Sequence, residues 1–174
     1  MKLNYENILI REATVEDAEF LCRWWNDGKV MEHAGFPNGL GITIEEVREE
    51  IKETKGKLHI IVYMDYPIGE MGYREIDVGI CEIGIKICDF SKQNKGLGKT
   101  VLSLFLNALF NDYGYQKIVL DTNLNNNRAQ HVYERLGFKK IGINHNSWKD
   151  QLGNWQSSVD YELTKDCFVS FIKE

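Results

Sequence analysis

Gln93-Asn94-Lys95-Gly96-Leu97-Gly98 is followed directly by a strongly apolar run, Val101 to Phe110, and is preceded by a strand-like segment, Ile83 to Cys88. The order of strand, glycine-bearing loop and helix leaves several backbone N–H groups without partners at the helix N-terminus. Those donors, with the positive end of the helix dipole behind them, form a site suited to phosphate groups. The stretch therefore predicts a phosphate-bearing ligand at this loop.

Length and composition are those of one globular domain. The 174 residues can bury a sizeable core, and 43% hydrophobic with 27% charged residues is ordinary for such a domain. No apolar run approaches the roughly 20 residues that span a bilayer. Met1 to Arg11 also lacks the apolar stretch of a secretory signal. We expect a single domain over residues 1–174 that does not bind a membrane.

Cysteine usage and net charge narrow the functional classes to which the protein could belong. Cys22, Cys81, Cys88 and Cys167 form no Cys-x-x-Cys pair, and no histidines cluster beside them. This pattern predicts free thiols in a reducing cytoplasm and no metal site. The net charge of −5 argues against a nucleic-acid binder and fits a cationic partner such as an amine.

Hydrophobic periodicity and turn residues predict the element order βααβββαβαββ. The expected strands cover residues 7–11, 58–64, 68–75, 79–88, 117–121, 138–143 and 157–163, and the expected helices cover residues 14–26, 43–54, 98–113 and 125–136. This order predicts an α/β or α+β domain with a central mixed sheet.

Two familiar phosphate loops do not fit the glycine-bearing segment. Gly98-Lys99-Thr100 looks like the end of a P-loop, but the glycine required five residues before Gly98 is replaced by Gln93. A dinucleotide fingerprint needs a glycine three residues after Gly98, where the chain has Val101. A glycine turn that only connects strand to helix remains an alternative.

A second segment relates the loop to a known family. Gln93, Gly96 and Gly98 form a Gln-x-x-Gly-x-Gly pattern that resembles the acyl-CoA pyrophosphate loop of the GNAT superfamily of N-acetyltransferases. Asn126-Asn127-Arg128-Ala129 and Tyr133-Glu134-Arg135-Leu136-Gly137-Phe138 resemble the later motif of that family. Ile10 to Thr14, Trp24 to Asp27 and Glu82 to Gly84 look like the branch of ribosomal-protein N-terminal acetyltransferases.

The resemblance implies a fold and a ligand. The fold would be the GNAT-type acyl-CoA N-acyltransferase fold, a central mixed and mostly antiparallel sheet flanked by helices. Acetyl-CoA would be the co-substrate, without a metal. The implied pyrophosphate loop consists of Gln93, Asn94, Lys95, Gly96, Leu97, Gly98, Lys99 and Thr100. The resemblance also implies that the backbone at Ile87 and Cys88 holds the pantetheine arm, and that Asn126 contacts the cofactor or caps a helix.

The resemblance also suggests catalytic groups. Tyr133 would protonate the departing thiolate as a general acid, although its helix position also suits a core residue. Glu82 would remove the proton from the acceptor amine, with a solvent-facing strand carboxylate as the alternative and Glu70 as a second candidate. Acceptor specificity would arise near residues Trp24, Trp25, Glu32, His33, Phe36, Trp148 and Trp155, the last two beside an expected loop from Asn144 to Asn154. For Trp24 and Trp25 individually, packing of the helix onto the sheet is the favoured alternative.

These features predict an N-acetyltransferase that uses direct transfer to a primary amine. The acceptor would be a protein N-terminus, a polyamine or other small amine, or an aminoglycoside. A catalytically silent CoA-binding sensor or scaffold and a nucleotide-binding protein are the rival interpretations. We expect a monomer or a homodimer.

Overall fold

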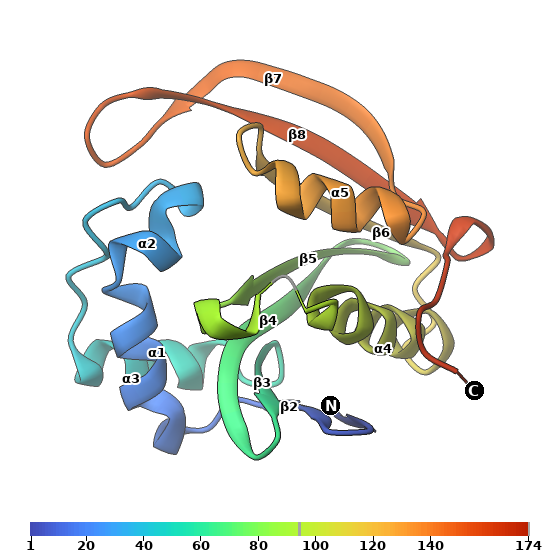
Figure 1. The fold of residues 1–174 in the computed structure, drawn as a ribbon, viewed down its shortest axis with the longest axis horizontal. Coiled ribbons are helices and arrows are strands. Elements are labelled where there is room, and N and C mark those ends of the chain that lie inside the picture. Colours follow the sequence, from blue (N-terminus) through green and yellow to red (C-terminus); the bar gives the residue numbers. More distant parts are fainter. Residues whose placement is uncertain (94, 174) are drawn as a thin grey trace.

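An eight-stranded mixed sheet forms the centre of the fold (Figure 1). The computed structural model describes residues 1–93 and 95–173. The strands lie in the order β1-β2-β3-β4-β5-β6-β8-β7. Their bounds are β1 (Lys2–Tyr5), β2 (Ile8–Glu12), β3 (Leu58–Tyr63), β4 (Tyr66–Asp77), β5 (Ile80–Ile87), β6 (Lys117–Asn123), β7 (Lys139–Lys149) and β8 (Trp155–Thr164).

Helices cover both faces of the sheet (Figure 1). The α-helices are α1 (Ala18–Trp25), α2 (Gly28–Met31), α3 (Ile44–Glu53), α4 (Leu97–Asn111) and α5 (Asn127–Arg135). Short 3₁₀ turns are η1 (Val15–Asp17), η2 (Glu32–Ala34), η3 (Phe90–Lys92) and η4 (Lys165–Cys167). One apolar core joins α4 and α5 to the sheet, and a second core joins α1, α2 and α3 to the other face.

Helix α4 is the most deeply buried helix because nearly all of its sides are apolar. Val101, Phe105 and Leu109 are fully buried against the sheet. A helix that is apolar on most sides is stable only when neighbours cover it on more than one side. Its N-terminus is thereby fixed beside the end of β5.

The pairing of β5 with β6 sets the position of the site. All other neighbouring strands pair antiparallel, whereas β5 and β6 run parallel. Their ladder covers only three positions and ends at Glu82 opposite Val119. Past that point the described residues of the two strands form no further ladder. The sheet therefore splits between β5 and β6 towards the N-termini of α4 and α5.

The fold confirms the predicted mixed sheet and its flanking helices, and several elements differ from expectation. Strand β1 and the short helices α2 and η2 were not predicted. The expected loop from Asn144 to Asn154 is largely strand, because β7 continues to Lys149 and β8 starts at Trp155. Trp24 and Trp25 are both buried in the core beneath α1. Across the described residues, no helix is long and apolar enough to cross a membrane.

Candidate active site

The split between β5 and β6 contains a cavity of about 1080 Å³. Its walls come from β5, β6, the loop before α4, the start of α5, and the α2–η2 segment. Trp148 on β7 and Ser158 on β8 close it from the far side. The cavity therefore connects the glycine-bearing loop to the region expected to hold the acceptor.

The N-terminus of α4 has the features of a phosphate cradle. Gly96 occupies the N-cap position with a φ of 77°, a left-handed conformation that favours glycine. Among the described residues, no side chain caps the helix and no acidic residue lies in its first turn. A Cβ placed on Gly98 would meet no described atom within 4 Å, so the space beside this first-turn residue is open. The N–H groups of this first turn are oriented to receive an anion.

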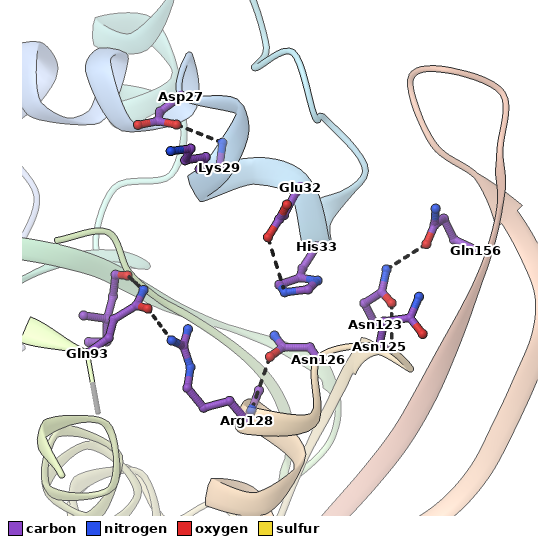
Figure 2. A network of polar contacts seen from close by, with 12 residues as sticks. Asp27, Lys29, Glu32, His33, Gln93, Asn123, Asn125, Asn126, Arg128 and Gln156 are labelled. Atoms are coloured by element: carbon purple, nitrogen blue, oxygen red, sulfur yellow. Dashed lines mark hydrogen bonds and ion pairs between the residues drawn. The ribbon is translucent and has the colours of Figure 1, made fainter. Parts of the chain in front are cut away.

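Gln93 links the two sides of the split near this cradle. Its amide Nε2 donates to the carbonyl of Ile87 at 2.8 Å, and its Oε1 accepts from Arg128 on α5 (Figure 2). Arg128 also lines the cavity, where its guanidinium supplies a positive charge. The side chain of Gln93 therefore connects the end of β5 to the start of α5 by hydrogen bonds.

The structure places most of the predicted cofactor residues around the cavity. The residues that line it are Ile87, Gln93, Gly96, Gly98, Lys99, Asn126 and Tyr133. Lys95, Leu97, Thr100 and Cys88 are not among the described lining residues. Asn94 lies outside the described residues. Lys99 stacks its Nζ over Phe171 at 4.7 Å, so part of its charge is held by an aromatic ring.

The register of β5 separates Ile87 from Cys88. The N–H of Cys88 donates to the carbonyl of Ile68 on the β4 side at 2.8 Å. Because backbone groups alternate between the two edges of a strand, Ile83, Ile85 and Ile87 direct theirs towards β6 and the split. The expectation for Cys88 is therefore corrected, since its N–H is already bonded on the other edge.

The side chain of Cys88 is also unsuited to chemistry. It is buried in the core beneath α1, and burial raises the pKa of its thiol far above the ordinary value. A thiol in such a site remains protonated and unreactive.

Tyr133 lies on α5 and lines the cavity. Its ring packs against Phe138 at 5.7 Å and Tyr161 at 5.9 Å, and the residue is only 7% exposed. Burial, reinforced by the charge of Asp121, raises the pKa of Tyr133 to about 12. Its hydroxyl is therefore protonated at neutral pH and is available as a proton donor to the cavity.

Asn126 caps α5, which is one of the two roles expected for it, and its contact with the cofactor stays a prediction. Its Oδ1 accepts from the N–H of Ala129 at 3.2 Å, which makes it the N-cap of α5 (Figure 2). The residue also lines the cavity. Just before it, Asn123 accepts from the N–H of Asn125 and donates to Gln156, which fixes the turn between β6 and α5.

The predicted base, Glu82, lies at the vertex of the split. It forms an ion pair with Arg74 and is not among the described residues that line the cavity. Asp121, on the neighbouring strand, does line it. Burial, then the charges of Glu82 and Asp160, raise the pKa of Asp121 above the ordinary carboxyl value.

The acceptor side of the cavity is framed by α2, η2 and the β7–β8 hairpin. Figure 2 shows the His33 ring between the η2 turn and Asn126, and its Nε2 lies 3.8 Å from Glu32 Oε1. The β7–β8 hairpin contacts the end of η2, where the backbone N–H of Gln151 donates to the carbonyl of Gly35 at 2.8 Å. A Cβ on Gly35 would approach the Trp148 ring to 2.4 Å, so this contact requires glycine.

Three residues around the site were not predicted to act there. Arg128 was quoted only as part of a motif, although its spacing on α5 could have pointed to the cavity. Asp121 ends the predicted strand before α5, which is a frequent position for functional side chains. Lys86 is a charged residue within an apolar alternating strand, and it lines the cavity from β5.

Comparisons with known proteins agree with this geometry. A family model described as an acetyltransferase (GNAT) domain matches residues 7–139. Aminoglycoside N(6')-acetyltransferase type 1 of Klebsiella pneumoniae is 26% identical over 154 residues, which cover 79% of this chain and 76% of that protein.

Two solved structures share the fold. Spermidine N-acetyltransferase from Vibrio cholerae, in complex with CoA and spermine, has a TM-score of 0.83 at 20% identity over 94% of this chain and 98% of that one. RimL, a ribosomal L7/L12 alpha-N-protein acetyltransferase in complex with coenzyme A, has a TM-score of 0.84 at 16% identity over 96% and 99%. Since the family model spans most of the sequence, this chain belongs to the GNAT family of acetyltransferases.

Proposed function

We propose that this protein transfers the acetyl group of acetyl-CoA directly to a primary amine of a small cationic acceptor. The observation that carries the proposal is the continuous cavity in the split sheet. It leads from the anion cradle at Gly96 and Gly98, past the buried Tyr133, to an acceptor side that contains Asp121. This order matches the order of pyrophosphate, thioester and amine in the reaction.

The cavity fits acetyl-CoA along its length. The first N–H groups of α4 would hold the pyrophosphate, with Arg128 and Lys99 as nearby positive charges. The backbone groups of Ile83 and Ile85 that face the split would bond the pantetheine arm as a missing strand would. An N–H on this edge would also donate to the carbonyl oxygen as negative charge develops on it. The hydrogen bonds of Gln93 to Ile87 and Arg128 would hold the two walls together beside this arm.

Direct transfer needs one proton acceptor and one proton donor. The neutral amine attacks the thioester carbon, the C–S bond breaks, and the leaving thiolate takes the proton of the Tyr133 hydroxyl. The nitrogen loses its extra proton as the amide forms, and that proton restores the Tyr133 hydroxyl. A covalent intermediate on Cys88 is disfavoured, because that thiol is buried away from the cavity.

Asp121 is the better-placed base. An amine arrives as an ammonium ion with a pKa of about 10.4 and must lose a proton before it attacks. Asp121 lines the cavity, and a carboxylate with a raised pKa accepts a proton more readily than an ordinary one. Glu82 and Asp160 then act as neighbours that maintain this pKa.

The acidic groups near the vertex favour a positively charged acceptor. Asp121 and Asp160 are directly opposed on β6 and β8, and Glu82 is close enough to raise the pKa of Asp121. Such a cluster attracts an ammonium ion from solution. The similar proteins named above, which by their names acetylate aminoglycosides and spermidine, support this choice. The four free cysteines fit a cytoplasmic location, which we also propose.

Turnover with a panel of amines tests the proposal. The purified protein is mixed with acetyl-CoA and, separately, with kanamycin, spermidine, alkylamines and an N-terminal peptide, and release of the CoA thiol is followed. We expect thiol release with at least one small cationic amine. Thermal stabilisation by acetyl-CoA without turnover on any amine would favour a sensor. Stabilisation by ATP with magnesium but not by acetyl-CoA would favour a nucleotide site.

A further inference from the structure

A second cavity of about 470 Å³ lies beside the first, between the sheet and the layer of α1, α2 and α3. The two cavities share Gly84, Ile85 and Lys86 of β5. Most of the second wall is apolar, with Trp25, Leu40 and Met71 among its residues. The strand that faces the proposed thioester site therefore also forms the floor of a separate apolar space.

The inner polar group of this second cavity is an ion pair between buried Glu70 and half-buried Lys86. Glu50 on α3 also lines the cavity, but it is exposed to solvent, which screens its charge. Lys86 Nζ lies 3.1 Å from Glu70 Oε1, and the indole N–H of Trp25 donates to the same oxygen at 3.0 Å. The Glu70 side chain is 7% exposed. Among the described residues both donors use Oε1, so Oε2 is left to the cavity. Burial alone would lower the pKa of Lys86, but the charge and hydrogen bond of Glu70 outweigh it and raise that pKa.

The balance of charge in the pair determines what it can bind. A second ammonium would approach Lys86, and a carboxylate would approach Glu70, so either charge meets a like charge in a poorly solvated space. A hydroxyl or an amide instead donates to Glu70 Oε2 and accepts from Lys86. The pair thus selects a neutral group that is both donor and acceptor.

The two cavities are within reach of one small molecule. A Cβ on Gly84 would meet no atom within 4 Å, so open space lies over the residue they share. Two residues along a strand span about 7 Å, and Lys86 is directly opposite Glu70 in the register. A chain of about six methylene groups bridges this interval.

We propose that the cavity at Glu70 and Lys86 is a second subsite for the acceptor, which binds an apolar segment ending in a neutral hydroxyl or amide. The inference rests on the proposed function, since it describes the far end of the molecule whose amine is acetylated over Gly84. The substrate class is then an amine with an apolar body and an uncharged polar end.

Four acceptors that differ only at the far end test the subsite. They are 6-aminohexan-1-ol, hexylamine, 1,6-diaminohexane and 6-aminohexanoate, and kcat/KM is measured from CoA release at one pH. We expect the alcohol to exceed each of the others by at least about tenfold, because it alone pairs with both partners of the ion pair. Equal kcat/KM values across the four acceptors would overturn the subsite.

Two variants should change the preferred acceptor in opposite directions. Lys86→Met leaves the Glu70 carboxylate without its cation, so 1,6-diaminohexane becomes the best acceptor. Glu70→Gln leaves the Lys86 ammonium, so 6-aminohexanoate becomes the best. The control is Lys117→Met, which removes a lysine from a more exposed pair with Glu162 and should leave the order of the four acceptors unchanged. If neither charge variant alters the order, the subsite is wrong.

Two further variants protect the test against misfolding. The double variant Glu70→Gln with Lys86→Met removes both charges together, which proteins tolerate better than an unpaired buried charge. It should remove the discrimination between the alcohol and hexylamine. Leu40→Trp, at a residue that lines the second cavity and not the first, narrows the second cavity and should keep activity on methylamine while the six-carbon acceptors lose at least about tenfold. Folded variants are identified by their thermal shift with acetyl-CoA.

The outcomes separate the two proposals. If the wild type acetylates none of these amines or the wider panel, the proposed function fails. If it acetylates them but the far end and the Glu70, Lys86 and Leu40 variants make no difference, only the second subsite fails.

Discussion

Replacing Tyr133 with phenylalanine isolates the proposed proton donor. The ring contacts with Phe138 and Tyr161 at 5.7 and 5.9 Å would be kept. Within residues 1–93 and 95–173 the hydroxyl has no hydrogen-bond partner, so its removal leaves no group unpaired. We therefore expect the free energy of unfolding to change by at most about 1 kcal/mol.

The same substitution should reduce turnover strongly. Loss of a general acid typically lowers kcat by about 10²–10⁴-fold, equivalent to about 2.7–5.4 kcal/mol of barrier. Because the pKa of Tyr133 is raised to about 12, the wild type should show no alkaline loss from this group below about pH 11. CoA release under saturating acetyl-CoA and amine gives kcat, and urea unfolding gives stability.

A matched variant controls for the tyrosine ring itself. Tyr161→Phe also removes a hydroxyl from the same aromatic cluster. This hydroxyl donates a 3.0 Å hydrogen bond to Glu134 and has no role in the proposed reaction. It should lose about 1 kcal/mol of stability and keep its kcat. A Tyr133→Phe protein that is folded and turns over as fast as the wild type would refute the general-acid role.

Three further predictions follow from the site and the core. Asp121→Asn should lower kcat by about 10²-fold. The kcat of the wild type should rise with pH as Asp121 deprotonates at its raised pKa, and the variant should lose this dependence. A variant whose kcat depends on acidic pH as that of the wild type does would contradict this role. Gly98→Ala should keep or increase stability, by up to about 1 kcal/mol, yet raise the KM for acetyl-CoA, since the added methyl enters the open cradle; thermal unfolding with and without acetyl-CoA measures both. Burial lowers the pKa of His59 from 6.5, and a hydrogen bond to the Lys57 carbonyl, which by itself would raise that pKa, only partly offsets the effect. The unfolded chain therefore takes up this proton first, and stability should fall as pH drops below 6.5. The urea midpoint at pH 7.5 and 5.5 should differ less in His59→Phe.

The elements predicted well are those whose signals are local. Helix α4 follows from an apolar run after glycines, and its start at Leu97 lies one residue from the expected Gly98. Helix α5 follows from the asparagine cap and the glycine at position 137. The proposed phosphate cradle lies at the start of α4, where a local signal predicts the helix; that it binds phosphate stays a prediction.

Elements that depend on distant contacts were missed. Helix α2 has only four residues, too few for a periodic pattern, and its position depends on the cap at Asp27 and on packing against α1. Strand β7 is exposed on both faces along most of its length, so it carries no apolar alternation that would distinguish it from a loop. Its end is positioned by the contact between Trp148 and Gly35, which are far apart in sequence.

The same limit applies to the side chains of the site. Gln93 and Arg128 meet across 35 positions of sequence, and Glu70 and Lys86 meet across 16, so no local pattern reveals either pair. Glu82 was favoured as the base because it shares the strand that enters the site. The structure shows that this strand turns the Glu82 carboxylate towards Arg74, while Asp121 on the next strand faces the cavity.

Strand β5 organises the whole site because its successive residues have different surroundings. The odd positions Ile83, Ile85 and Ile87 direct their backbone groups into the split, where the pantetheine arm would lie. The even positions Gly84 and Lys86 form the floor of both cavities, where the acceptor would lie. In this proposal, backbone recognition of acetyl-CoA would be insensitive to side-chain identity on this strand. The acceptor would be recognised by side chains, so its specificity would change at Lys86 without loss of the co-substrate site.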